Sequence, residues 1–143
     1  MLSAEIKSDI ARGIDVVVDR YYHSGCVYSA AKLNPALDLR WARLPEEGLP
    51  SPDIVFFLDI SAEDAAKRGG YGEERYEKKD MQDRVRTLFR QMAEGVDGHE
   101  FLTINGGLPE DDVAAKIQTY CMEAISTVDK AQVPLGKLQP GPR

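Results

Sequence analysis

The chain has 143 residues, a length that suits one domain built around a single hydrophobic core. Its composition, 43% hydrophobic and 29% charged, excludes disorder of the whole chain. The chain lacks both a run of about eighteen apolar residues, which a transmembrane helix needs, and a signal-peptide core near its start. The net charge of −6 argues against a general nucleic-acid binder. We therefore expect neither a membrane nor a nucleic-acid partner.

The cysteines indicate the compartment. Cys26 and Cys121 are far apart and lack the spacing of metal ligands. They predict two reduced thiols in an intracellular protein, cytoplasmic or nuclear.

Hydrophobic patterning predicts an α/β fold with a parallel sheet, because short apolar strands alternate with amphipathic helices. The predicted strands cover 14–18, 53–58 and 100–104. The predicted helices are 4–12, one emerging within 21–32, one from Asn34 to about Leu44, a short one capped by Ser61, a long one after 69–75 and one opened by Pro109. The tail from Val133 is rich in Pro, Gly and Lys, and its end is predicted to be mobile.

The first predicted strand ends in two charged residues. The run 14–18 is mostly β-branched and apolar, which is typical of a parallel strand buried on both faces. Asp19 and Arg20 follow it, at the sheet edge where ligands bind in such folds. There a carboxylate can hold Mg²⁺, directly or through water, and a guanidinium can clamp a phosphate. The alternative is an internal ion pair that closes the strand.

Two further segments are candidates for ligand contacts. Residues 67–77 contain three glycines with cations on both sides, and such a loop could close over a nucleotide. The alternative is a solvated connection between helices. Asn105, Gly106 and Gly107 follow the last strand, where backbone groups could contact a base. A plain turn is the favoured interpretation of that tripeptide.

Other signals are weaker. His23 is predicted to be packed rather than catalytic, His99 to be solvated, and Trp41 to anchor the core or an interface. A phosphate-binding loop of the form GxxxxGK followed by Ser or Thr is absent from the sequence. The one Gly-Lys pair, Gly136 and Lys137, lies in the tail.

One set of motifs resembles a known family, the thymidylate kinases. Asp19-Arg20-Tyr21, followed by Ser24-Gly25 and residues 28–32, resembles the family's DR(Y/F)xxSxxAYxxAK signature. Residues 48–53 resemble the family's GLPxPD motif. Residues 65–69 with 74–77 resemble the lid of its eukaryotic-type branch, and residues 134–138 resemble the end of that branch. The resemblance is collinear and covers nearly the whole chain.

The resemblance implies transfer of the γ-phosphoryl group of MgATP to dTMP, giving dTDP. By position in the motif, Asp19 would stand near Mg²⁺, directly or through water, and Arg20 would hold the dTMP phosphate. Ser24, Gly25 and Tyr28 would line the dTMP site.

The resemblance also assigns residues on the lid side and around ATP. Tyr76 and Gln82 would be lid-side neighbours of dTMP. Arg68 would lie against the adenine of ATP, and the loop at Asn105 and Gly106 would border that base.

The chain departs from the family pattern at its beginning. Family members start with a strand, the phosphate loop, a helix and a second strand, all before the helix that leads into Asp19. The implied fold is a three-layer, parallel-sheet P-loop kinase fold that is N-terminally incomplete. It forms one domain over 1–143, with a lid at about 67–80 and a mobile tail at about 133–143. We expect a truncated enzyme with little phosphoryl transfer of its own.

The family's strand order has a consequence for the sheet. The missing first strand would lie between the strands at 14–18 and 53–58. Without it, both strands would expose unpaired backbone groups and apolar side chains. We therefore expect that the chain alone either does not hold the family sheet or pairs with another chain.

Two alternatives remain open. The chain could be a non-catalytic nucleotide-binding or dimerisation module derived from a kinase, since the family pattern implies a homodimer through helices around 2–12 and 26–44. It could also be another nucleoside or nucleotide kinase of the same fold, although Tyr21 through Lys32 argues against this.

Overall fold

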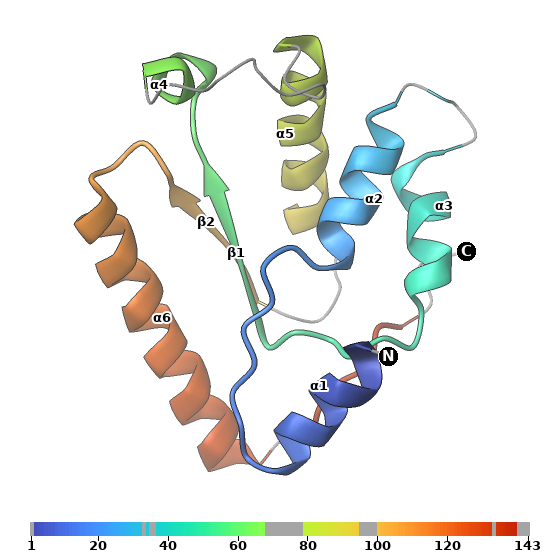
Figure 1. Ribbon diagram of the computed structural model, residues 1–143, viewed down its shortest axis with the longest axis vertical. Coiled ribbons are helices and arrows are strands. Elements are labelled where there is room, and N and C mark those ends of the chain that lie inside the picture. The colour runs from blue at the N-terminus through green and yellow to red at the C-terminus, as the bar shows by residue number, and fades with distance from the viewer. Residues whose placement is uncertain are drawn as a thin grey trace.

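The computed structural model describes residues 2–32, 34, 37–67, 79–94, 100–132 and 134–139. In chain order its elements are α1 (Leu2–Ala11), α2 (Tyr22–Ala30), α3 (Leu39–Arg43), the 3₁₀ helix η1 (Leu44–Glu46), β1 (Ile54–Asp59), α4 (Ala62–Lys67), α5 (Lys79–Glu94), β2 (Glu100–Asn105) and α6 (Glu110–Ala131). Figure 1 shows α2 and α5 on one side of the strands and α6 on the other. This layering agrees with the predicted α/β class.

Strands β1 and β2 form a parallel pair whose register runs from Ile54 opposite Glu100 to Asp59 opposite Asn105. The two predicted strands are therefore confirmed, with boundaries that differ by one residue. Because the pair is in register to its last residue, the carboxyl ends Asp59 and Asn105 lie side by side.

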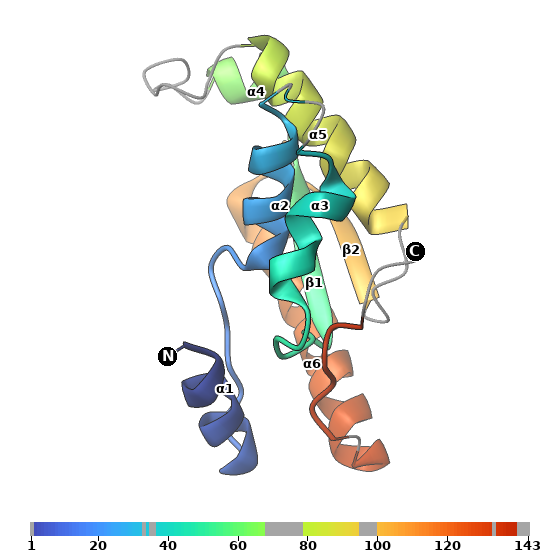
Figure 2. The same cartoon turned by 90° about the vertical axis from the view of Figure 1, so that its right-hand side faces the viewer.

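The strand predicted at 14–18 is wrong for this structure. Residues 14–18 have no regular secondary structure and join no ladder, and the sheet in the described residues contains β1 and β2 alone. The side chains of Ile14, Val17 and Val18 are 41%, 94% and 37% exposed. Figure 2 shows this segment, between α1 and α2, standing apart from β1. A strand forms only when it pairs with a neighbouring strand. The structure does show the exposure of apolar side chains that we expected for this run.

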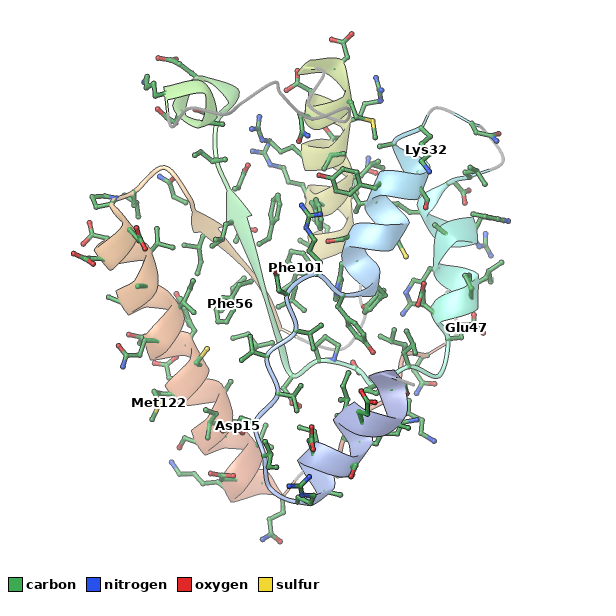
Figure 3. All side chains as sticks on the ribbon, viewed as in Figure 1. Asp15, Lys32, Glu47, Phe56, Phe101 and Met122 are labelled. Carbon is green, nitrogen blue, oxygen red and sulfur yellow. The ribbon has the colours of Figure 1, made fainter. Side chains whose placement is uncertain are left out.

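Alternation along β1 divides its side chains between the two helical layers. Phe57 stacks on Phe89 of α5, with ring centroids 4.7 Å apart and planes at 18°. On β2, Phe101 meets the edge of His23 from α2 at 5.7 Å. In Figure 3, Phe101 lies toward α2 and Phe56 toward α6.

The tightest part of the core lies between α2, α3 and α5. Val27 and Cys26 of α2 are 0% and 1% exposed. The Cys26 thiol donates to the carbonyl of Ala42 in α3 at 3.4 Å. The Arg84 guanidinium of α5 donates to the carbonyl of Ala31 at 3.1 Å, just past the end of α2. Apolar packing and these bonds fix α2 against both neighbouring helices.

Two helix starts illustrate local capping. Ser61 caps α4 as predicted, because its hydroxyl accepts from the Asp64 N–H at 3.0 Å. The helix predicted from Asn34 begins later, at Leu39. Asp38 is extended there, with φ −73° and ψ 172°, and its carboxylate accepts from the Trp41 N–H at 2.7 Å. The Asp38 cap therefore sets the start of α3.

The described part of the tail is anchored to the loop before β1. Pro50 and Lys137 form an antiparallel bridge, and the Leu138 N–H donates to the Leu49 carbonyl at 2.9 Å. The Leu138 side chain is 3% exposed within the core. Of the tail predicted to be mobile, about 133–143, residues 133 and 140–143 lie outside the described residues, as does most of the predicted lid.

We expect Leu138→Ala to lower the free energy of unfolding by about 2–4 kcal/mol, because it removes buried apolar volume and leaves a cavity between helices. Urea denaturation followed by circular dichroism measures the change. Lys137→Ala is the matched control, since its side chain is exposed while its backbone keeps the bridge. Equal midpoints for the two variants would show that the tail does not stabilise the fold.

Candidate functional site

The carboxyl edge of the two strands is closed by a hydrogen-bonded turn. The Gly106 N–H donates to the Asp59 carbonyl at 2.7 Å, which ties the chain after β2 to the end of β1. The Gly107 N–H donates to Oδ1 of Asn105 at 2.8 Å. A Cβ at Gly107 would stand 3.1 Å from that oxygen, so the turn favours glycine there. The edge therefore presents a compact turn, in line with the favoured interpretation of this tripeptide.

A charged cluster that the sequence interpretation missed lies beside this turn. The Asp59 carboxylate, 18% exposed, receives Nε of Arg86 at 2.9 Å and a terminal nitrogen of Arg90 at 2.6 Å. Arg86 also donates to the Ile60 carbonyl. The sequence did carry a signal for this cluster. Asp59 shares a strand face with Phe57, and Arg86 and Arg90 lie one turn apart on the predicted long amphipathic helix.

Asp19 and Arg20 form an exposed bend that leads into α2. Arg20 has φ 61°, in the left-handed region that a non-glycine residue enters at a cost of about 1–2 kcal/mol. Neither residue forms an ion pair with any described residue, so the described structure gives no support to the internal-pair alternative. The result is an exposed cation next to the N-terminus of a helix, a combination that favours anions.

Helix α2 carries the next three predicted site residues. Ser24 and Tyr28 are half-buried and one turn apart, which places them on one face. Tyr28 packs against the core, while Gly25 is exposed and has open space where a Cβ would stand. Gln82 is half-buried near the start of α5, the helix that packs against α2. Arg68 and Tyr76 lie outside the described residues.

Tyr21 fixes the direction in which α2 begins. Its hydroxyl donates to the Pro50 carbonyl at 3.1 Å, and its ring meets Tyr22 edge-on at 5.3 Å. Burial, with a smaller contribution from the Glu46 carboxylate, raises the pKa of the Tyr21 phenol. Tyr21 therefore stays protonated and can donate well into the alkaline range.

His23 follows Tyr22 and is packed as predicted. It is 5% exposed and its ring lies 3.8 Å from that of Tyr22, centroid to centroid. This environment suits a structural histidine within the aromatic layer between α2 and the strands.

The described residues contain neither a cluster of metal ligands nor a membrane-spanning helix. Among the residues that the structure describes, no group of three or more His, Cys, Asp or Glu side chains could hold a metal ion. One exposed carboxylate, Asp19, still fits Mg²⁺, which keeps several waters and binds largely through substrate phosphates. No helix within the described ranges is long and apolar enough to cross a membrane.

Comparison with known proteins gives a consistent family. A family model described as thymidylate kinase matches residues 1–117. The thymidylate kinase of Schizosaccharomyces pombe is 41% identical over 114 residues, 78% of this chain and 53% of that protein. The human thymidylate kinase is 37% identical over 133 residues, 93% of this chain and 60% of that protein.

A solved structure supports the fold. The structure of thymidylate kinase from Candida albicans matches with a TM-score of 0.73 at 24% identity, covering 96% of this chain and 67% of that one. This match confirms the predicted kinase-like α/β fold. The chain spans about half the length of the curated relatives it matches.

We expect Asp59→Asn to destabilise the fold by about 1–3 kcal/mol, because two guanidinium groups lose a charged acceptor. Arg86 contributes most of the loss, since Arg90 is 60% exposed and its pairing is screened by solvent. Thermal and urea denaturation measure the effect. Asp53→Asn, at the exposed residue before β1, is the control and should change stability little. Equal losses in both variants would contradict a specific role for the cluster.

Proposed function

The chain belongs to the thymidylate kinase family, and from this premise we propose that its site serves transfer of the γ-phosphoryl group of MgATP to dTMP, giving dTDP. The observation that carries the proposal is the Arg20 bend. There an exposed arginine, with its backbone in the left-handed region, precedes the N-terminus of α2. A conformation that costs energy is retained where the side chain must point in one direction.

The proposed dTMP site is built on α2. Arg20 binds the phosphate of dTMP, and Ser24, Gly25 and Tyr28 line the nucleoside. The open space above Gly25 supports close approach of a ligand to the helix backbone. Tyr76 and Gln82 approach the same nucleotide from the lid side.

The proposed ATP site adjoins the turn after β2. Arg68 packs on the adenine and the turn at Asn105 and Gly106 borders it. Asp19 holds the Mg²⁺ of MgATP through water. Bound Mg²⁺ neutralises the charge on the phosphate oxygens.

We further propose that the 143 residues by themselves are inactive or strongly impaired. The sequence contains no GxxxxGK loop followed by Ser or Thr, so these residues supply no lysine of that kind to the transferred phosphoryl group. The run 14–18 that leads into Asp19 also has no sheet neighbour among the described residues. Phosphoryl transfer depends on positioning and charge stabilisation, and losing either costs orders of magnitude in rate.

A coupled assay of the purified chain with ATP and dTMP tests the activity. We expect turnover far below the ~1–100 s⁻¹ typical of kinases. Turnover within that range would overturn the proposed impairment while supporting the proposed reaction.

Binding of dTMP tests the site apart from turnover. We expect Arg20→Asn to weaken dTMP binding at least about tenfold in isothermal titration calorimetry, because a charge-assisted contact to phosphate is lost. Asparagine tolerates the left-handed conformation, so the change removes the charge without new strain. Arg40→Asn, at an exposed position of α3, is the matched control. Equal affinities for all three proteins would refute the assignment of Arg20.

A second candidate function is a dimerisation module without catalysis. Trp41 of α3 and Leu44, the first residue of η1, are 49% and 56% exposed, which supports a contact surface on this pair of short helices. Weak dTMP binding without ATP turnover, together with a dimer that Trp41→Ala dissociates, would favour it. A cytoplasmic or nuclear location remains a prediction from the family and the thiols.

A further inference from the structure

Tyr21, the residue directly after Arg20, is anchored by a long-range contact. It occupies the N-cap position of α2, with φ −112° and ψ −163°, and makes no side-chain cap hydrogen bond there. Its hydroxyl donates instead to the Pro50 carbonyl at 3.1 Å, across 29 positions of the chain. This bond ties the start of α2, where a local side-chain cap is missing, to the loop before β1.

The ring of Tyr21 is packed as well. It meets the Tyr22 ring edge-on, with centroids 5.3 Å apart and planes at 77°, and its centroid lies 6.5 Å from that of the His23 ring. Tyr22 and His23 are 4% and 5% exposed, so these neighbours are themselves fixed in the core. Aromatic packing restricts the rotamers of Tyr21, and the hydroxyl bond then sets its direction.

The acceptor on Pro50 is held by the tail. On one side of Pro50, the Leu49 carbonyl accepts from the Leu138 N–H at 2.9 Å. On the other side, the Ser51 N–H donates to the Gly136 carbonyl at 2.9 Å. Figure 1 shows the tail, in red, beside this loop, where the two form an antiparallel bridge. Pro50 is buried and its ring fixes φ, so its carbonyl is a firm point of attachment.

Arg20 is one peptide unit away from this anchor. Its φ of 61° lies in the left-handed region, which is costly for a residue with a side chain. Such a conformation persists only where the surrounding structure fixes it. The contacts of Tyr21 supply this restraint on the C-terminal side of Arg20. Loss of the hydroxyl bond would let the backbone at Arg20 relax toward a more favourable region, and the guanidinium would change direction.

We infer that Tyr21 is a positioning residue for dTMP, because its bond to the Pro50 carbonyl keeps the Arg20 guanidinium directed at the phosphate. The inference rests on the proposed function, in which Arg20 binds that phosphate. It adds a residue outside the set proposed to line the nucleotide, and it gives the Tyr21 hydroxyl a role in affinity besides its role in packing. Since the restraint acts through Arg20, it has no effect on binding once the guanidinium is removed.

A double-mutant cycle on the full chain, measured by isothermal titration calorimetry with dTMP, tests the inference. We expect Tyr21→Phe, which keeps the ring, to weaken dTMP binding about threefold to tenfold, the scale of one hydrogen bond. In the Arg20→Asn background the same change should have no further effect. Tyr120→Phe removes the hydroxyl of a 38% exposed tyrosine on α6 and is the matched control, which should bind dTMP as wild type does.

The outcomes of this cycle separate the inference from the proposed function. Wild type that does not bind dTMP, or that binds it no better than Arg20→Asn, refutes the proposed function and the inference with it. Weaker binding by Arg20→Asn together with unchanged binding by Tyr21→Phe overturns the inference alone. An equal loss from Tyr21→Phe in both backgrounds also overturns it, since that result indicates a general structural effect.

Amide hydrogen exchange gives a second readout that needs no nucleotide. We expect Tyr21→Phe to speed exchange at Ser24, whose N–H donates to the Tyr21 carbonyl at 3.1 Å in the first turn of α2. Amides of α5 should exchange as in wild type, which verifies that the variant is folded. Unchanged exchange at Ser24, or equal acceleration in α5, counts against the inference.

Discussion

The structure depends on the face that β1 presents to α5. Within the part of the chain that the structure describes, β1 has one strand neighbour, which is half of the ladder that would normally fix a central strand. Its position is set by the side chains on one face. The Phe57 ring stacks on Phe89, and two residues later Asp59 is bridged by Arg86 and Arg90. An apolar contact and an ionic contact along the same pair of elements resist sliding and tilting together.

The same face connects the strands to the proposed nucleotide sites. Helix α5 also packs on α2, which carries most of the proposed dTMP site. At the start of α2, the Tyr21 hydroxyl is bonded to Pro50, in the loop that the tail holds through Leu138. Residues more than a hundred positions apart in the chain thus act on the orientation of one short helix.

Sequence patterns predicted the elements whose stability is local or strongly apolar. Both strands of the observed sheet, the Ser61 cap and the packed His23 followed from periodicity and residue type. The run 14–18 carried an equally good strand signal, yet pairing is a property of two segments, and the described chain has no neighbour for it. Asp38 and Asn34 are both good N-cap residues, so residue type alone does not decide between them. The backbone angles at Asp38 make it the cap of α3.

Some features of the candidate site could likewise be predicted from the sequence and others could not. The motif residues of α2 could be located from the sequence because they lie within one helix. The left-handed conformation of Arg20 and the bridging of Asp59 could not, because the first depends on how the run enters α2 and the second joins residues about thirty positions apart. Arg68 and Tyr76, in the proposed lid, lie outside the residues that the structure describes.

The burial of Cys26 gives the molecule an internal reporter. Its thiol is 1% exposed and donates to Ala42, so an alkylating reagent reaches it when α2 and α3 separate. Cys121, on α6, is partly exposed, so its reaction does not require that α2 and α3 separate. The two thiols therefore distinguish opening of the helical core from events on the opposite face, within one unmodified chain.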